Sequence, residues 1–298
     1  MALASLSLPK NSRVITAANA GGYGTIAINR NQLIPHYVDV DDNGLINIQS
    51  ILDVSKEIKA VIVTHLYGQA TQLESLATLL KDRGIFLIED CAQAVGAFIG
   101  ENRAGSIGDV STFSFYPTKN LGSIGDSGAV CTSNPEIFGR LEMLREYGWS
   151  NRYFSQLPQG SNNRIDEIQA LVLELQIHKV DQWNFRRREI WERYKLAARK
   201  SGCRLIGNNS NSFVAHLAVL DLRNRKSFMN HMLKSGIETS IHYPYPDYVQ
   251  PGLFQGNLEE PLLNTERLCS SVVSIPIFPE LEEEEISRVE VALANYKE

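Results

Sequence analysis

Over its first half the chain alternates short apolar runs with segments of helical spacing. The apolar runs, which read as strands, lie at residues 13–16, 34–41, 60–65, 84–92, 110–115 and 127–133. Residues 71–84, between two of these runs, have the spacing of a helix and end at a glycine, as helices often do. Because apolar strands that alternate with helices are buried on both faces, the pattern predicts an α/β fold with a mostly parallel central sheet flanked by helices.

The second half has a different pattern. A long helical segment covers 166–202, and after it come a strand-like run at 212–221, a helix near 225–237 and a last helix from 282. We therefore expect a large α/β domain over residues 1–182 and, over 183–298, a linking helix with a small α+β domain. The acids from Glu282 to Glu285 are expected in the first turn of the last helix, where negative charge suits the helix dipole.

Several polar and aromatic positions have simple structural interpretations. Trp183 and Trp191 are eight residues apart, which places both on one buried face of the long helix. The three arginines at 186–188 are interpreted as a solvated face of the same helix rather than as a clamp for a diphosphate. His65, which follows the third strand-like run, is interpreted as a hydrogen-bonded core or loop histidine.

Composition and charge exclude several classes of function. The 298 residues carry a net charge of −5, so the chain has no surplus of basic groups for binding nucleic acid. No apolar run approaches the ~18–20 residues that span a bilayer, and we expect no membrane partner. The four cysteines have no CxxC spacing, which predicts free thiols in a reducing cytoplasm and argues against a metal site.

Candidate chemistry lies where two predicted strands end. One strand runs into Glu89 and Asp90, and "SFYPTKNLG" places Lys119 between a strand and a glycine-rich loop. Ligands of α/β sheets sit at such strand ends. Together, Asp90 and Lys119 suit pyridoxal phosphate, since its aldehyde needs an amine and its ring nitrogen a carboxylate. Ser114 is then placed to offer a hydroxyl to the cofactor's phosphate, and Gln93 is placed to reach the phenolic oxygen of its ring. For Glu89, a solvent-facing or helix-capping position stays equally open.

A set of segments in this order carries a resemblance. "IEDCAQAVGA", "GSIGDVSTFSFYPTKNLGSIGDSGAV", "LREYG" and "GSNNRIDEIQA" resemble the sugar-nucleotide aminotransferases of the DegT/DnrJ/EryC1/StrS family, as do "IHYP" and "SIPIFPEL" further on. The resemblance implies the fold-type-I aspartate-aminotransferase architecture with pyridoxal 5'-phosphate as cofactor. It implies that Lys119 is the Schiff-base lysine and Asp90 the partner of the pyridinium nitrogen. Gln93 resembles the residue that contacts the ring's phenolic oxygen, and Ser114 resembles a phosphate ligand.

The resemblance also implies substrates and a partner. Asn162 resembles an asparagine that reaches the cofactor phosphate of the other subunit, which implies a homodimer with shared active sites. Tyr23, Arg164 and His242 are the positions expected to contact substrate. The implied substrates are a nucleotide-linked keto-deoxysugar and an amino-acid donor, glutamate, for polysaccharide or glycoside biosynthesis. Lys119 stands where related dehydratases carry histidine, which favours transamination, and "SFYPTKNLGSIGD" resembles members that act on 3-keto sugars.

Two departures from the family pattern leave alternatives, and one of them is that the aromatic expected to stack on the pyridine ring falls on Gly21, with Tyr23 two residues on. Family members carry further residues before the first residue here, among them a Ser-Gly-Thr turn that holds the phosphate. The resemblance therefore implies an N-terminal truncation, with exposed apolar surface near Leu3, Leu6 and Leu8. An alternative is a catalytically impaired paralogue, either a binding protein or a gene remnant. NAD binding is a further alternative, because "GYGTIA" fits a dinucleotide-binding turn, although Pro35 leaves little room for the crossover helix.

Overall fold

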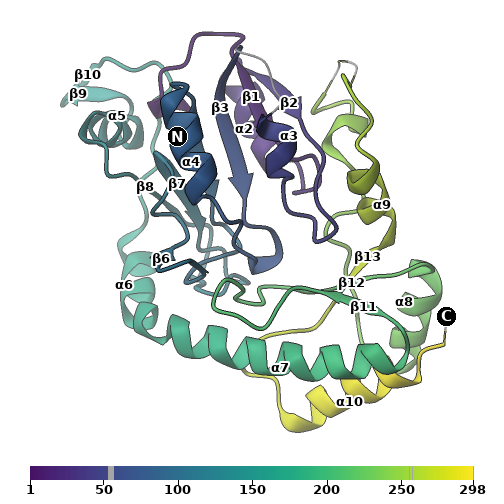
Figure 1. Cartoon of the computed structure of the whole chain (residues 1–298). Helices are drawn as coiled ribbons and strands as arrows, with labels where there is room; N and C mark the ends of the chain where they lie inside the picture. Colours follow the sequence, from purple (N-terminus) through teal and green to yellow (C-terminus); the bar gives the residue numbers. More distant parts are fainter. Residues whose placement is uncertain (53–56, 255, 257, 298) are drawn as a thin grey trace.

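The computed structural model of the chain describes residues 1–52, 57–254, 256 and 258–297 (Figure 1). Its centre is a six-stranded sheet with the order β2-β1-β3-β4-β7-β8. The strands are β1 (Arg13–Thr16), β2 (Ile34–Tyr37), β3 (Ile58–Thr64), β4 (Phe86–Asp90), β7 (Val110–Ser114) and β8 (Gly128–Cys131). Neighbouring strands run parallel up to β7, and β8 pairs antiparallel with it. The mostly parallel sheet predicted from the apolar runs is confirmed.

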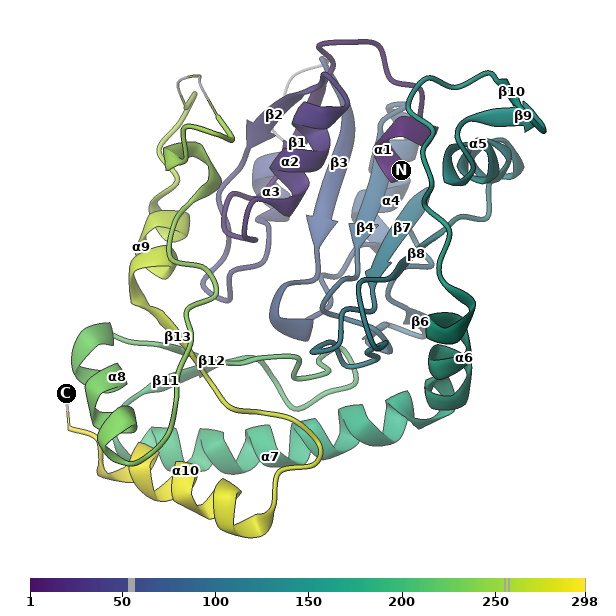
Figure 2. The ribbon, with the colours of Figure 1, turned by 180° about the vertical axis from the view of Figure 1, so that it is seen from behind.

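Helices cover both faces of this sheet because its strands are apolar on both sides. Along β3, Val61 and Val63 enter the core beneath α4 (Glu74–Asp82), whereas the alternate residues Ala60 and Ile62 enter the core on the opposite face. Figure 2 shows that opposite face, with α1 (Ala2–Ser5), α2 (Tyr23–Arg30) and α5 (Pro135–Arg145). The short helix α3 (Ile48–Leu52) lies on the α4 side. This alternation is the period-two geometry of a strand.

The first residues of the chain form part of the core. Leu3 and Leu6 are each 5% exposed and belong to the same apolar cluster as Ile137 and Leu141 of α5. Leu8 is partly buried against that cluster. The expectation of exposed apolar surface at these leucines is therefore wrong, because α1 packs its apolar side chains against α5.

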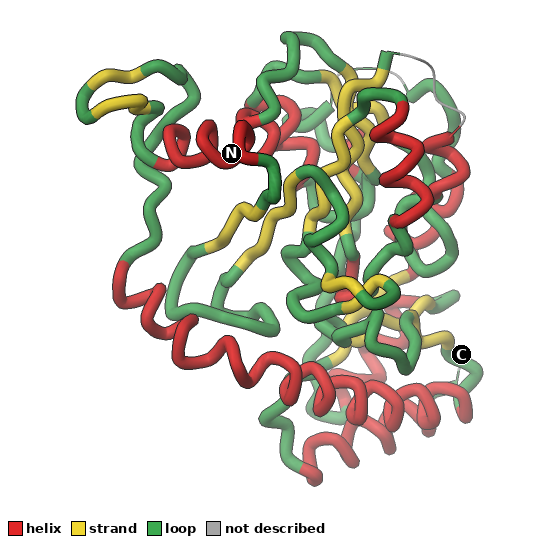
Figure 3. The backbone as a smooth tube through the Cα atoms, turned by 60° about the vertical axis from the view of Figure 1, so that its left-hand side comes forward, coloured by secondary structure: helices red, strands yellow, loops and turns green. Residues whose placement is uncertain are grey.

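The long helical segment is divided into three pieces, seen from the side in Figure 3. They are α6 (Glu167–Gln176), the 3₁₀ turn η2 (Ile177–Lys179) and α7 (Val180–Lys200). Trp191 is fully buried in the second half of α7, as predicted, but Trp183 is only partly buried. Arg187 is also buried, so the interpretation of all three neighbouring arginines as a solvated face is wrong.

A three-stranded antiparallel sheet packs on α7. Its strands are β11 (Arg204–Ile206), β12 (Ala218–Asp221) and β13 (Val272–Ile275), in that order. The helices α8 (Arg225–Lys234) and α10 (Glu283–Asn295) complete this second core. Glu282 caps α10 in a reciprocal capping box with Glu285, so the acidic run does begin the last helix. The proposed boundary between 182 and 183 stays a prediction.

The remaining elements are short. They are η1 (Leu66–Gly68), β5 (Phe98–Ile99), β6 (Asn102–Arg103), β9 (Trp149–Asn151), β10 (Phe154–Ser155), η3 (Asp247–Val249) and α9 (Leu263–Ser271). The β9–β10 hairpin projects away from the rest of the chain (Figure 3). No described helix is both long and apolar enough to cross a membrane.

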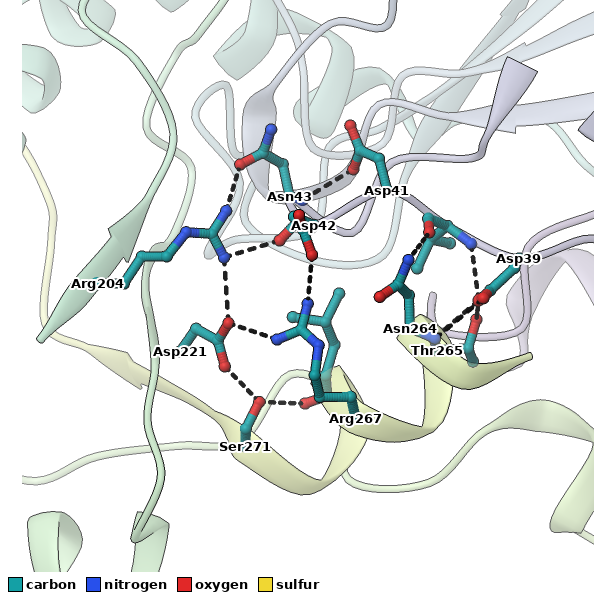
Figure 4. A network of polar contacts seen from close by, with 12 residues as sticks. Asp39, Asp41, Asp42, Asn43, Arg204, Asp221, Asn264, Thr265, Arg267 and Ser271 are labelled. Carbon is teal, nitrogen blue, oxygen red and sulfur yellow. Dashed lines mark hydrogen bonds and ion pairs between the residues drawn. The ribbon is translucent and has the colours of Figure 1, made fainter. Parts of the chain in front are cut away.

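A polar network joins the loop after β2 to the second sheet (Figure 4). Asp221 of β12 accepts hydrogen bonds from Arg204 at 3.1 Å, Arg267 at 2.7 Å and Ser271 at 2.6 Å. The two arginines also bond the Asp42 backbone carbonyl and the Asp42 carboxylate. Burial alone would raise the pKa of Asp221, but the hydrogen bonds from Ser271 and Arg267 outweigh it and the pKa is lowered. The network fixes the second sheet against the first.

Candidate active site

A cavity of about 1340 Å³ lies at the carboxyl ends of β3, β4 and β7, next to the second sheet. Most of the sequence-predicted site residues line it: Tyr23, Asp90, Gln93, Ser114, Lys119 and His242. They come from both halves of the chain, since His242 follows α8 whereas the others precede α5. The parallel strands explain the location, because their carboxyl ends meet at one edge of the sheet.

Asp90 ends β4 and is held in a fixed orientation. Its Oδ1 accepts a hydrogen bond from the Ala92 backbone N–H at 3.0 Å. Its Oδ2 accepts one from Thr64 Oγ1, opposite it on β3, at 3.3 Å. Asp90 is partly buried and lines the cavity. Two donors thus orient a carboxylate that still faces open space.

Glu89, the preceding residue, points to the other side of the sheet and is completely buried. It accepts hydrogen bonds from the backbone N–H groups of Gly105, Ile107 and Gly108 at 2.6–2.8 Å and pairs with His65 Nε2 at 3.0 Å. Burial would raise the pKa of Glu89, but these hydrogen bonds, led by that of His65, lower it. Its role is therefore structural, and the solvent-facing alternative is wrong.

His65 is buried and hydrogen-bonded on both nitrogens, as its interpretation as a core histidine predicted. Its Nδ1 accepts the backbone N–H of Thr71 at 3.1 Å, so the proton lies on Nε2, which donates to Glu89. With Cys91, these two residues form a cluster whose ligand atoms lie within 4.8 Å of one another. The histidine and carboxylate ligand atoms of this cluster already take part in hydrogen bonds. The expectation of no metal site stays a prediction.

Lys119 follows β7 in a tight turn, in which its backbone N–H donates to the Tyr116 carbonyl at 2.8 Å. Gly122 permits this turn, because a Cβ there would lie 2.5 Å from the Pro117 carbonyl oxygen. The lysine side chain lines the cavity and forms no ion pair with any residue that the structure describes. Burial lowers its pKa, and the nearby charge of Asp90 only partly opposes this.

Behind Lys119 lies a buried polar network that the sequence did not indicate. Asn120 donates from Nδ2 to Asn184 Oδ1 at 2.7 Å and to the Val214 carbonyl at 3.0 Å. Its Oδ1 therefore accepts from His216 Nδ1, at 2.9 Å, which places the imidazole proton on Nδ1. Burial lowers the pKa of His216 well below its ordinary value. The network anchors the turn that carries Lys119 to α7 and to the segment between β11 and β12.

Gln93 and two tyrosines, Tyr23 and Tyr243, are in contact along the lining of the cavity. Gln93 Oε1 accepts the Tyr67 backbone N–H at 2.6 Å, and its Nε2 donates to the Tyr243 hydroxyl at 3.1 Å. The Tyr243 ring meets the Tyr23 ring edge to face at 6.4 Å. His242 Nδ1 bonds Ser274 Oγ at 2.8 Å, and burial lowers its pKa. These contacts place an aromatic wall beside the lysine.

Two predicted residues lie outside the cavity of this chain. Asn162 and Arg164 are exposed, in the segment between the β9–β10 hairpin and α6. Arg164 pairs with Glu146 at 3.5 Å and stacks on the Tyr147 ring. Ser114 does line the cavity, and its Oγ accepts the Tyr116 N–H at 3.4 Å. A single chain therefore brings together six of the eight predicted positions.

Comparisons with known proteins point in one direction. The model of the DegT/DnrJ/EryC1/StrS aminotransferase family matches residues 1–294. A relative from Aneurinibacillus thermoaerophilus, dTDP-3-amino-3,6-dideoxy-alpha-D-galactopyranose transaminase, is 37% identical over 95% of this chain and 78% of its own length.

Two solved structures are also similar over most of the chain. S. venezuelae DesV, determined in complex with a ketimine intermediate, has a TM-score of 0.91 and 32% identity over 98% of this chain and 80% of its own. A Bacillus subtilis protein, ntda, determined with bound cofactor PMP, has a TM-score of 0.89 and 25% identity over 98% of this chain and 69% of its own.

Proposed function

Because the chain belongs to the DegT/DnrJ/EryC1/StrS aminotransferase family, we propose that it transfers an amino group from glutamate to a nucleotide-linked keto-deoxysugar. The predicted family and the fold-type-I architecture are confirmed. The observation that carries the proposal is the placement of Lys119 and Asp90 at one cavity, at the ends of neighbouring strands. The same comparisons favour an enzyme over an impaired paralogue or an NAD-binding protein.

The residues of the cavity fit pyridoxal phosphate, the cofactor of this family. Lys119 offers a partly buried amine without an ion-pair partner among the described residues, and Asp90 offers a carboxylate oriented by two donors. When bound, the cofactor supplies an aldehyde that takes up amines and a ring that withdraws electrons. Lys119 would hold the aldehyde and Asp90 the ring nitrogen, and Ser114 and Gln93 line the same cavity.

The chain's own residues then perform acid–base chemistry. Burial lowers the pKa of Lys119, so more of its amine is neutral near pH 7 and able to accept a proton. The Asn120–His216 network holds the backbone of that turn, which limits where the amine moves. Lys119 would therefore be the group that moves a proton between the donor's α-carbon and the cofactor's aldehyde carbon.

The size of the cavity and the relatives support the substrate class. About 1340 Å³ exceeds the roughly 300–1,000 Å³ of most small-ligand pockets, which suits a nucleotide carrying a sugar. The Aneurinibacillus relative is named for a 3-amino sugar, which supports amination at C3. The product would be an amino sugar for polysaccharide or glycoside synthesis. Free cysteines, one of them exposed, suit a reducing cytoplasm.

We further propose a homodimer with shared sites. Helix α6 has no buried residue, and its Ile168, Leu171 and Leu175 are 53–62% exposed. Tyr153 and Phe154 of the hairpin are 74% and 65% exposed. Contiguous exposed apolar surface marks an association site. Asn162 lies between these two elements, so a partner docked there would receive it, as its resemblance implies.

An absorbance experiment tests the function. The purified chain is mixed with pyridoxal phosphate, and glutamate is then added without a sugar nucleotide. We expect a visible absorbance band that glutamate bleaches, and a nucleotide 3-keto sugar that restores it while becoming an amino sugar by mass spectrometry. No band, or a band that no amino acid changes, would show that the chain is not an aminotransferase.

A further inference from the structure

Thr64 and Asp90 form a cross-strand pair at the cavity edge of the sheet. Thr64 is the last residue of β3 and lies directly opposite Asp90, the last residue of β4. Both residues line the cavity and both are partly buried. The two main chains are joined at this level, since the His65 backbone N–H donates to the Asp90 carbonyl at 3.0 Å. The sheet itself therefore holds Thr64 beside the carboxylate.

The hydroxyl of Thr64 is the one side-chain donor to Asp90 among the residues that the structure describes. It donates to Oδ2 at 3.3 Å, and the Ala92 backbone N–H donates to Oδ1 at 3.0 Å. A carboxylate has about four acceptor positions, so about two are left for a ligand of the cavity. Glu89, on the other face of the sheet, instead accepts four hydrogen bonds from the protein. Asp90 thus has enough donors to be oriented and too few to be fully occupied.

A second threonine, on the other side of Asp90, makes no such contact. Thr112 of β7 is in register with Asp90, lines the same cavity and is likewise partly buried. In the described part of the chain, no hydrogen bond joins the Thr112 side chain to Asp90. The row of Thr64, Asp90 and Thr112 across three strands therefore has a donor on one side only. Thr112 is a matched comparison for Thr64.

A hydroxyl donor affects a carboxylate in two ways. With a second donor on the other oxygen, it fixes the plane of the group, which a single hydrogen bond would leave free to turn. It also favours the charged carboxylate over the carboxylic acid. The branched side chain of threonine has few rotamers, so the hydroxyl of Thr64 is itself held in place. A carboxylate that pairs with a protonated ring nitrogen has to stay charged, because otherwise the proton moves onto the carboxylate.

We propose that Thr64 is a positioning residue that acts through Asp90. Its hydroxyl holds the Asp90 carboxylate charged and turned toward the cavity, so that the proton of the pair stays on the cofactor's ring nitrogen. This inference rests on the proposed transaminase function and adds to it a residue whose effect passes through the carboxylate. The competing explanation is that Thr64 only fills space at the end of β3, and the experiment separates the two.

The experiment compares the cofactor-loaded wild type with Thr64→Val, Thr64→Ser, Thr112→Val, Asp90→Asn and the double variant Thr64→Val, Asp90→Asn. Valine has nearly the shape of threonine but no hydroxyl, whereas serine keeps the hydroxyl. The first measurement is the NMR resonance of the ring nitrogen in ¹⁵N-labelled pyridoxal phosphate, without any substrate. The second is the bleaching of the cofactor band by glutamate in a single turnover, which gives a rate constant and an apparent dissociation constant.

We expect Thr64→Val to slow bleaching by about tenfold, the low end for a hydrogen bond to a charged group, because the contact is long. The apparent dissociation constant for glutamate should change by less than about threefold, since Thr64 acts on the chemistry and not on the donor. The ring-nitrogen resonance should move from its wild-type position toward that of an unprotonated pyridine. Thr64→Ser should recover most of both effects, and Thr112→Val should produce neither.

The double variant tests the route of the effect. In the Asp90→Asn background, Thr64→Val should change the bleaching rate by less than about twofold, because the charge on which the hydroxyl acts is already gone. A full tenfold loss in that background would show that Thr64 does not act through Asp90.

Other results overturn the inference. An unchanged ring-nitrogen resonance in Thr64→Val, or equal effects in Thr64→Val and Thr112→Val, would make Thr64 a packing residue. If Thr64→Val does not fold, Thr64→Ala also lacks the hydroxyl and is held to the same outcomes. A wild-type protein that binds the cofactor but that no amino acid bleaches overturns the proposed function, while the ring-nitrogen resonance still tests Thr64.

Discussion

The cavity edge of the sheet and the outer face of α6 differ in what they leave without a partner. At the cavity the groups without a charged partner are polar. Lys119 forms no ion pair with a described residue, and Asp90, although it accepts hydrogen bonds from Thr64 and the Ala92 N–H, still faces the cavity. On α6 the unpartnered groups are apolar, with Ile168 and Leu175 each more than 60% exposed. An unsatisfied polar group in a cavity indicates a small-molecule ligand, whereas exposed apolar side chains on one helix indicate a protein partner.

The largest expected effect concerns Lys119, whose amine lines the cavity. Lys119→Ala should abolish turnover, by at least the roughly 10²–10⁴-fold attributed to a positioned acid or base, because no other described lysine lines the cavity. After borohydride treatment of the cofactor-loaded wild type, peptide mapping should find the label on Lys119. Exposed Lys10 replaced by alanine is the control. A label that persists in the Lys119→Ala protein would refute the assignment.

Next is the carboxylate that faces the cavity. Asp90→Asn should reduce kcat by about 10²-fold or more, as when a preorganised electrostatic group is removed from an active site, while cofactor content falls much less. The amide oxygen can still accept the Ala92 N–H, and the amide NH2 can donate to the Thr64 hydroxyl, so the local fold is retained. Steady-state rates and the ratio of cofactor to protein check this. A near-normal kcat would remove Asp90 from its role.

The apolar face of α6 is tested by placing charged side chains on it and measuring self-association. The double variant Ile168→Asp, Leu175→Asp should weaken self-association by about 10²–10⁴-fold, since each fully buried aliphatic side chain contributes about 1.5–3 kcal/mol. Leu233→Asp on α8, 64% exposed in this chain, is the matched control. Light scattering over a concentration series gives the result. A wild-type monomer at all concentrations would contradict the dimer.

Shared sites make a separate prediction. If Asn162 enters the partner's cavity, then Lys119→Ala and Asn162→Ala chains, each inactive alone, should regain activity when mixed, because mixed dimers contain one intact composite site. The activity of the mixture is measured after subunit exchange has been verified. No recovery despite exchange would show that each site is built within one chain.

The buried Glu89 should govern stability rather than chemistry. Glu89→Gln removes the charge that three backbone N–H groups and His65 bind, at a cost of about 3 kcal/mol in the free energy of unfolding. The folded pKa is lowered, so the stabilisation is present above the ordinary value of 4.5 and is lost as pH falls through the folded pKa. Denaturation from pH 7 to 3 should show that the difference between wild type and variant shrinks in acid.

The smallest expected effect concerns Asp247, whose substitution should stabilise the protein rather than destabilise it. Asp247 is 2% exposed, accepts from Thr25 at 2.6 Å and leaves Oδ1 without a partner, and burial raises its pKa to about 6. Because the folded pKa is raised, the stability contributed by protonated Asp247 is fully present below pH 3.8, the ordinary pKa, and is lost as pH rises through about 6. Asp247→Asn should therefore gain about 2 kcal/mol at pH 8 and almost nothing at pH 4. An equal effect at both pH values would contradict the assigned cause.

The sequence by itself determined the features that depend on local order along the chain. Apolar runs specify the strands of the first sheet, and because strands of one direction end together, Asp90 and Lys119 had to meet at one edge. The capping acids before α10 and the turn around Gly122 are likewise local, since their partners lie within a few residues. These parts of the fold and site were predictable.

Only the tertiary structure decided the rest. Arg187 and His216 are nearly thirty residues apart, and neither has a distinctive sequence context; the cavity wall forms because α7 crosses beneath the second sheet. Leu3 and Leu6 are buried by a helix more than a hundred residues away. Burial and counter-charge are properties of what surrounds a side chain, and those surroundings come from distant segments, so no local pattern contains them.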